Sequence, residues 1–172
     1  NYKNKINRIR KILKSNKADY VFISAPENVA WTLNIRGSDN PNSPIPNCRL
    51  IIGKTNEIFL ITQKQKISKI IKEGKLSMKQ IINPKKFIDL IGKLKGKKFI
   101  IDHLSCSVLN EKIIQSKFKI INKHDPCYKL KSIKNSSEIK NMINAHIEDG
   151  AALTKFIFWI KYKNKKKITE MD

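Results

Sequence analysis

A short stretch around residue 102 carries side chains of the types used in acid–base and nucleophilic chemistry. Asp102 and His103 end a β-branched segment, and Ser105 and Cys106 follow closely, so an acid, a base and two nucleophiles are neighbours in sequence. Adjacent residues of a strand point to opposite faces of a sheet, which places Asp102 and His103 poorly for a mutual hydrogen bond. We therefore expect Asp102 to cap the turn after its strand and not to act in catalysis.

A second stretch, His146 with Glu148 and Asp149, has the residue types of a metal site. On a helix His146 and Asp149 share one side and Glu148 does not, so at most two ligands come together. We expect His146 to be a hydrogen-bonded residue at the edge of an apolar stripe. The sequence contains no Gly-rich phosphate loop, no His-Glu-x-x-His and no Gly-x-Ser-x-Gly. It therefore predicts no catalytic residue and no metal ligand in this chain.

The segment 34–46 is the third candidate, because it combines the densest cluster of turn-forming residues with an isolated arginine, Arg36. Only four of the 36 basic residues are arginines, and a planar guanidinium binds carboxylates in a way that lysine cannot. Arg36 is therefore a candidate for binding a carboxylate. The alternative is that Arg36 pairs with Asp39 and stiffens the loop, and the residues alone leave both possibilities open.

The formal net charge of +22 predicts weak binding of polyanions at low salt. The lysines are spread along the whole chain, and abundant Lys, Ile and Asn together are typical of an A/T-rich coding sequence, so we predict no specific nucleic-acid partner. The longest apolar stretch, Phe156 to Ile160, is far shorter than the roughly 20 residues of a membrane span. Three distant cysteines without a Cys-x-x-Cys pair predict structural thiols in a cytoplasmic protein: Cys48, Cys106 and Cys127.

The elements that would position these residues alternate between strands and helices as far as residue 121. The apolar periodicity predicts helices over 2–15, 26–33, 64–73, 84–94 and 108–115, and strands over 19–24, 49–52, 57–62, 80–82, 98–102 and 118–121. The turn at 53–56 suits a hairpin. The pattern therefore predicts an α/β fold with a mixed sheet flanked by helices.

The pattern changes after residue 121. Pro126 biases Asp125 away from helix, and Asn135 with Glu138 three residues later resembles a capping box that opens a long helix to about residue 161. We predict a first domain over 1–124, a linker over 125–135 and the start of a second domain over 136–172. The first residue is Asn1 and not Met, and we expect both ends to be cut.

Two segments resemble a known family. One segment resembles the Ala-Trp-Leu-x-Asn-x-Arg-Gly-Ser-Asp motif of the three-domain Xaa-Pro aminopeptidases, also called aminopeptidase P. It consists of residues 30–39, Ala-Trp-Thr-Leu-Asn-Ile-Arg-Gly-Ser-Asp, followed by Asn-Ser-Pro at 42–44. Residues 132–153 look like the entry to the catalytic domain of that family, and Trp159 and the pair 169–170 fit the same register.

The resemblance implies a creatinase N-terminal-like module, with a mixed β-sheet flanked by helices, followed by a long helix that begins a truncated pita-bread metallopeptidase domain. In the family, two divalent metal ions, commonly manganese, are held by two Asp, one His and two Glu, and a metal-bound hydroxide cleaves the bond between the first residue and a following proline. This chain stops before those ligands. The resemblance therefore implies a non-catalytic portion of a metalloaminopeptidase, inactive alone, whose full-length form is a homodimer that acts on proline-containing peptides.

The resemblance also implies a place for the loop. Four residues in or beside it are candidates for the edge of the substrate cleft and the domain junction: Trp31, Asn34, Arg36 and Asp39. The alternative function is a free-standing creatinase-like binding module with weak polyanion affinity.

Overall fold

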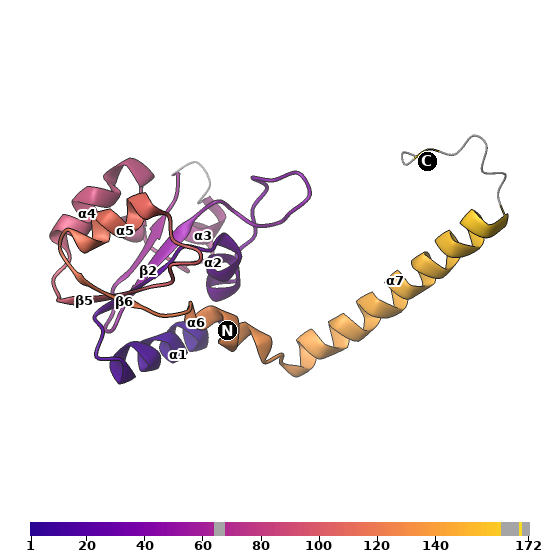
Figure 1. Ribbon diagram of the computed structural model, residues 1–172, viewed down its shortest axis with the longest axis horizontal. Coiled ribbons are helices and arrows are strands. Elements are labelled where there is room, and N and C mark those ends of the chain that lie inside the picture. Colours follow the sequence, from indigo (N-terminus) through magenta and orange to yellow (C-terminus); the bar gives the residue numbers. More distant parts are fainter. Residues whose placement is uncertain (64–67, 163–168, 170–172) are drawn as a thin grey trace. The chain divides into compact units, whose positions relative to one another are not determined.

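The computed structural model describes residues 1–63, 68–162 and 169 of the chain. The chain divides into two compact units, residues 1–132 and residues 133–172 (Figure 1). The first unit is an α/β domain and the second is built on one long helix. None of the described helices has the length and apolar character needed to cross a membrane.

A mixed sheet forms the centre of the first unit. Its six strands are β1 (Tyr20–Ile23), β2 (Arg49–Gly53), β3 (Ile58–Ile61), β4 (Ile81–Ile82), β5 (Lys98–Ile101) and β6 (Lys119–Asn122), in the order β4-β3-β2-β1-β5-β6. Strand β2 runs antiparallel to both β1 and β3, and the other neighbouring pairs are parallel. The predicted hairpin and the predicted mixed sheet are both confirmed.

Helices cover both faces of this sheet (Figure 1). One face carries α1 (Tyr2–Ser15), α2 (Pro26–Leu33), α3 (Ser68–Lys72) and α6 (Pro126–Ser132), and the other carries α4 (Phe87–Lys93) and α5 (Val108–Gln115). Two 3₁₀ turns, η2 (Met78–Gln80) and η3 (Pro84–Lys86), flank β4. The predicted helix over 64–73 is present as α3, and residues 64–67 lie outside the described residues.

The two faces of the sheet bury different kinds of side chain. Along β1, Val21 and Ile23 face an aliphatic core built with α1, α2 and α6, while Tyr20 and Phe22 face the core under α4 and α5. The second core is rich in aromatic pairs, among them Tyr20 and Phe99 with ring centroids 5.2 Å apart. Strands buried on both faces must be apolar at consecutive positions, which is why β1 shows no polar alternation.

Helix α6 lies within the segment predicted to be a linker, 125–135. Its side chains Cys127 and Leu130 are buried in the aliphatic core, so the chain belongs to the first unit as far as Ser132. Pro126 is the first residue of α6, where its missing N–H costs no hydrogen bond, and the Asp125 carboxylate accepts from the Cys127 N–H at 2.8 Å. The pair that breaks the preceding pattern therefore starts a helix.

The second unit contains α7 (Ser136–Tyr162). The predicted capping box is confirmed: the Asn135 side chain accepts from the Glu138 N–H at 2.9 Å, and the Glu138 carboxylate accepts from the Asn135 N–H at 2.8 Å. No residue of α7 is buried. Of the pair 169–170, only Thr169 is described.

Candidate functional site

The end of helix α2 determines the course of the loop that follows it. Asn34 adopts the left-handed conformation, with φ 51° and ψ 53°, which asparagine tolerates better than most other residues with a side chain. The Ile35 N–H then donates to the Ala30 carbonyl at 3.0 Å, which closes the last turn of the helix. The chain leaves the helix at this point and enters the turn-rich segment 35–46.

This loop is held by hydrogen bonds between its two sides. The Gly37 N–H donates to the Pro44 carbonyl at 2.9 Å, and the Asn47 N–H donates to the Asp39 carboxylate at 2.6 Å. Gly37 also lies so close to Pro46 that a Cβ atom at position 37 would be 2.6 Å from the Pro46 Cβ. A glycine is therefore required at position 37 by close approach of the two sides of the loop.

A cavity of about 770 Å³ lies between this loop, the end of α2 and the sheet; we call it the loop cavity. All four residues predicted as cleft candidates line it: Trp31, Asn34, Arg36 and Asp39. Its apolar lining includes the buried side chains of Cys48, Leu60 and Ile70. The loop cavity therefore combines an apolar lining with charged groups, as small-molecule and peptide sites do.

Arg36 is exposed at the loop cavity. Among the ion pairs of the described residues, none joins Arg36 to Asp39, and Asp39 instead accepts from the backbone of Asn47. Stiffening of the loop is thus achieved by a carboxylate-to-backbone hydrogen bond, and the guanidinium of Arg36 is available to solvent.

Two lysines that the sequence analysis did not single out hold the end of α2. The Lys5 ammonium donates to the Trp31 carbonyl at 2.7 Å and to the Asn34 side-chain oxygen at 2.5 Å, and it lies 4.3 Å from the centre of the Trp31 ring. The Lys75 ammonium donates to the Asn34 carbonyl at 2.7 Å and pairs with Glu73 at 2.7 Å. In a chain with lysine throughout, nothing in the sequence marks these two.

A buried polar network joins the first turn of α2 to α6. It consists of Asn28, Asp102, Asp125 and Lys131. The Asn28 amide donates to the Asp125 carboxylate at 2.7 Å and its oxygen accepts from Lys131 at 2.5 Å, while the Asp125 N–H donates to Asp102 at 2.9 Å. Burial raises the pKa of Asp125, which hydrogen bonds from Cys127 and Asn28 oppose. In the described part of the chain, every buried side-chain nitrogen or oxygen has a hydrogen-bond partner.

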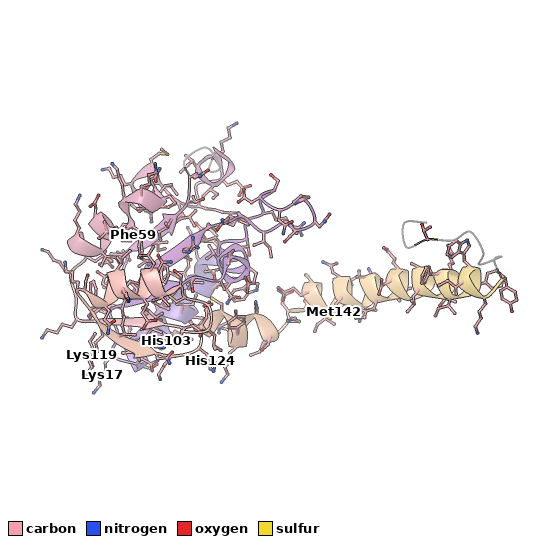
Figure 2. The ribbon with its side chains drawn as sticks, turned by 45° about the horizontal axis from the view of Figure 1, so that its top comes forward. Lys17, Phe59, His103, Lys119, His124 and Met142 are labelled. Carbon is pink, nitrogen blue, oxygen red and sulfur yellow. The ribbon has the colours of Figure 1, made fainter. Side chains whose placement is uncertain are left out.

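The stretch around residue 102 has a structural role. Asp102 accepts from the Leu104 N–H at 3.0 Å, so the predicted turn cap is confirmed. The His103 ring lies 3.3 Å from Glu111, and the exposed His124 ring lies 3.9 Å from Asp102. Figure 2 shows both histidines on the same side of the first unit, after β5 and β6.

None of the three cysteines, all of which the structure describes, forms a disulfide bond. Cys48 and Cys127 are buried, and burial raises the pKa of the Cys127 thiol far above its usual range. Burial, helped by the charge of Glu111, raises the pKa of the half-buried Cys106 to about 11. Cys106 and Cys127 therefore favour the thiol over the reactive thiolate near neutral pH, in agreement with structural roles.

On α7, the His146 ring nitrogen Nδ1 lies 2.8 Å from the Met142 carbonyl, so His146 is the hydrogen-bonded histidine that was predicted (Figure 2 labels Met142). Within the ranges 1–63 and 68–162 and at residue 169, no three side chains of His, Cys, Asp or Glu are grouped as a metal ion would require. The described residues therefore offer no site for the two metal ions that the resemblance assigns to ligands outside this chain.

Comparison with known proteins gives a consistent result. The chain is 30% identical to Xaa-Pro aminopeptidase 1 of Dictyostelium discoideum, covering 96% of this chain and 26% of that protein. It is 33% identical to Xaa-Pro aminopeptidase ApepP of Drosophila melanogaster, covering 89% of this chain and 25% of that protein. The chain spans about a quarter of the length of these curated relatives.

Solved structures show the same fold. X-prolyl aminopeptidase from Caenorhabditis elegans, described as a cytosolic enzyme with a di-nuclear active site, matches with a TM-score of 0.77 at 22% identity, covering 94% of this chain and 27% of that one. A proline dipeptidase from Streptococcus agalactiae matches with a TM-score of 0.52 over 73% of this chain. The family model of the creatinase/prolidase N-terminal domain matches residues 1–138. The chain therefore belongs to the family of creatinase/prolidase N-terminal domains.

Proposed function

We propose that this chain is the non-catalytic, creatinase-like part of a metal-dependent Xaa-Pro aminopeptidase, an enzyme that removes an N-terminal residue preceding proline. The observation that carries the proposal is the extent of the match. Similarity to a named Xaa-Pro aminopeptidase covers 96% of the chain and so runs through both units. The C. elegans aminopeptidase structure, which matches 94% of the chain, supports the same assignment.

In this proposal the first unit is a scaffold and the catalytic groups lie elsewhere in the full-length enzyme. That enzyme binds two divalent metal ions, which we propose to be manganese, and takes proline-containing peptides as substrates. It acts in the cytoplasm as a homodimer. The di-nuclear active site and the cytosolic description of the C. elegans enzyme support the metal count and the location. The 172-residue chain alone is inactive.

The loop cavity forms an edge of the substrate cleft in the intact enzyme. Its apolar lining at Leu60 and Ile70 suits an aliphatic or proline side chain, and the exposed guanidinium of Arg36 suits a carboxylate. Trp31 contributes a half-buried aromatic face to the same wall. The segment 30–39 would thus act on substrate binding and not on the chemical step.

The proposal is tested with the full-length enzyme and the 172-residue chain, both assayed with manganese on an Xaa-Pro tripeptide and on the matching Xaa-Ala tripeptide. We expect the full-length enzyme to cleave only the proline peptide and the 172-residue chain to cleave neither. The proposal is contradicted if the 172-residue chain cleaves the proline peptide, or if the full-length enzyme leaves the proline peptide intact.

The role of Arg36 is tested by Arg36→Lys in the full-length enzyme, with Arg8→Lys on the exposed side of α1 as the matched control. We expect the first change to raise KM about three- to tenfold with kcat unchanged, because a bidentate contact becomes a point charge. Equal KM and kcat values for the two variants would show that Arg36 does not bind substrate.

A second candidate, the free-standing binding module, rests on the net charge of +22. It predicts that an oligonucleotide and a non-nucleic polyanion such as heparin bind equally weakly, with affinity that falls steeply as salt is raised. Affinity that does not fall as the salt concentration is raised, or that depends on the nucleic-acid sequence, would contradict this candidate.

A further inference from the structure

We infer that Lys5 and Lys75 are positioning residues that hold the wall of the loop cavity formed by residues 31–36. The inference deepens the proposed function and rests on it, since the wall is proposed to bind substrate. It concerns two side chains that come from segments far from α2 in sequence: Lys5 from α1, and Lys75 from the stretch between α3 and η2.

The contacts of the two lysines are complementary. Lys5 binds the side-chain oxygen of Asn34 and Lys75 binds its backbone oxygen, at 2.5 and 2.7 Å. Asn34 is one of two described non-glycine residues with positive φ, the other being Lys17. A residue in that conformation persists where its surroundings fix it, and here the two ammonium groups hold it from both ends.

The electrostatics of the helix end favour the same arrangement. The last carbonyls of a helix lack partners within the helix and carry partial negative charge, so cations are stabilised there. Lys5 takes the Trp31 carbonyl and also lies over the Trp31 ring. One ammonium therefore fixes both the backbone and the ring of a residue that lines the loop cavity.

The burial of the pair distinguishes it from exposed lysines on the neighbouring helices. The Lys75 side chain is only 16% exposed and Lys5 is half-buried, whereas Lys11 on α1 and Lys72 on α3 are exposed. Arg36 lies two residues beyond Asn34, so an altered backbone at position 34 changes the direction in which the guanidinium enters the cavity. Lys5 does not line the loop cavity and is thus placed to act on Arg36 without touching the ligand, whereas Lys75 lines the cavity and also holds the Asn34 carbonyl.

The kinetic test uses the full-length enzyme with Lys5→Met and Lys75→Met, against the exposed controls Lys11→Met and Lys72→Met. Methionine keeps the length of the apolar stem and removes the ammonium. We expect KM for an Xaa-Pro tripeptide to rise about five- to tenfold in the first two variants, with kcat within twofold of the parent and with unchanged controls. Lys5→Arg should restore most of the affinity, because it keeps a donor at the helix end. Equal KM values in all four methionine variants overturn the inference. It is also overturned if Lys5→Met and Lys75→Met lower kcat in proportion to the fraction of enzyme that is folded and leave KM unchanged.

A second measurement separates positioning from overall stability. If Lys5, which does not line the cavity, acts through the wall, Lys5→Met and Arg36→Lys affect the same contact, so their combined effect on KM is smaller than the product of the two single effects. Independent, multiplicative effects contradict the inference.

A third measurement does not depend on activity. In the 172-residue chain, Trp159→Phe leaves Trp31 as the single tryptophan, and its quenching by acrylamide reports how open the wall is. We expect Lys5→Met to raise the quenching constant about twofold and Lys11→Met to leave it unchanged. If the full-length enzyme fails to cleave proline peptides, the proposed function fails, and the quenching still decides whether Lys5 holds the wall.

Discussion

Helix α2 is held at both of its ends by polar side chains from distant parts of the chain, yet the two ends differ in their access to water. In its first turn, Asn28 is fully buried between Asp125 and Lys131. At its last turn, Lys5 and Lys75 bind groups that border the loop cavity.

The difference determines what each set of contacts contributes. Removing a partner inside the buried network leaves donors and acceptors that water cannot reach, and this lowers the free energy of unfolding by more than the bond itself is worth. At the open end, water replaces a lost partner, so the main loss is the shape of the wall. Stability should therefore depend on the first end of α2, and ligand binding on the second.

The largest effect is expected for Asp125→Ala. It leaves the buried Asn28 amide and the Cys127 N–H without their acceptor, at a cost of about 2–4 kcal/mol. Urea denaturation measures the loss, with Asp149→Ala on the exposed side of α7 as the control. A change below about 0.5 kcal/mol at Asp125 would mean that the network does not support the fold.

Gly37→Ala should have the next largest effect. The new Cβ would lie 2.6 Å from the Pro46 Cβ and 2.7 Å from its Cα, so the two sides of the loop must separate, at about 1–3 kcal/mol. Gly92→Ala is the matched control, because nothing lies within 4 Å of a Cβ at position 92 and alanine favours the helix there. Equal unfolding curves for the two variants would show that the loop accommodates the methyl group without loss.

A smaller effect is expected for the pH dependence of stability, which tests the contribution of Asp125 at the first end of α2. Burial raises the pKa of Asp125 above its ordinary value of 3.8, so its contribution to stability is fully present below pH 3.8 and falls as the pH rises through the folded-state pKa. Asp125→Asn should therefore destabilise the protein more at pH 4 than at pH 7. Denaturation curves at both values measure this, and a larger loss at pH 7 would contradict the direction of the shift.

The pKa of Asp19 is shifted in the opposite direction to that of Asp125, so the two carboxylates should have opposite effects on the pH dependence of stability. Burial acts to raise its pKa, but hydrogen bonds from Lys54 and from the N–H groups of Lys97 and Lys98 outweigh burial and lower the pKa to about 2. Its contribution is present above pH 3.8 and is lost as the pH falls toward 2. Asp19→Asn should thus destabilise more at pH 5 than at pH 2, and an equal loss at both would contradict that.

The smallest effect is expected for the stability of Lys5→Met. Because water can replace the ammonium at the open end of α2, we expect a loss of no more than about 1 kcal/mol in urea denaturation. A loss as large as that of Asp125→Ala would remove the distinction between the two ends.

Most of the fold could be predicted because its signals are local. The spacing of Ile6, Ile9 and Leu13 indicates α1, and all three are buried as predicted for an amphipathic helix. The capping box at Asn135 and Glu138 marks the start of α7 for the same reason. The family resemblance is likewise carried by continuous segments, and it is confirmed.

The sequence analysis does not predict helix α6, although the signal for its start is also local. Asp125-Pro126 was interpreted as a break in the pattern, whereas an acceptor side chain followed by proline is equally the start of a helix. Only burial of Cys127 and Leu130 decides between the two interpretations, and burial depends on α1 and α2, which lie far away in sequence.

The candidate site was predictable in part. The resemblance carried by the single segment 30–39 points to Trp31, Asn34, Arg36 and Asp39. The structure places all four at one cavity. Their role in substrate binding stays a prediction. Lys5 could not be found, because its function depends on a contact 29 residues away and its type is the commonest in the chain.

The burial of Cys127 has a practical consequence. Its thiol is 0% exposed and lies 3.3 Å from the Thr32 hydroxyl, between α6 and α2. An alkylating reagent can reach this sulfur only while the two helices are apart. The rate at which Cys127 is alkylated under native conditions therefore measures how often the two helices separate. This thiol can report local unfolding of the protein without an added label.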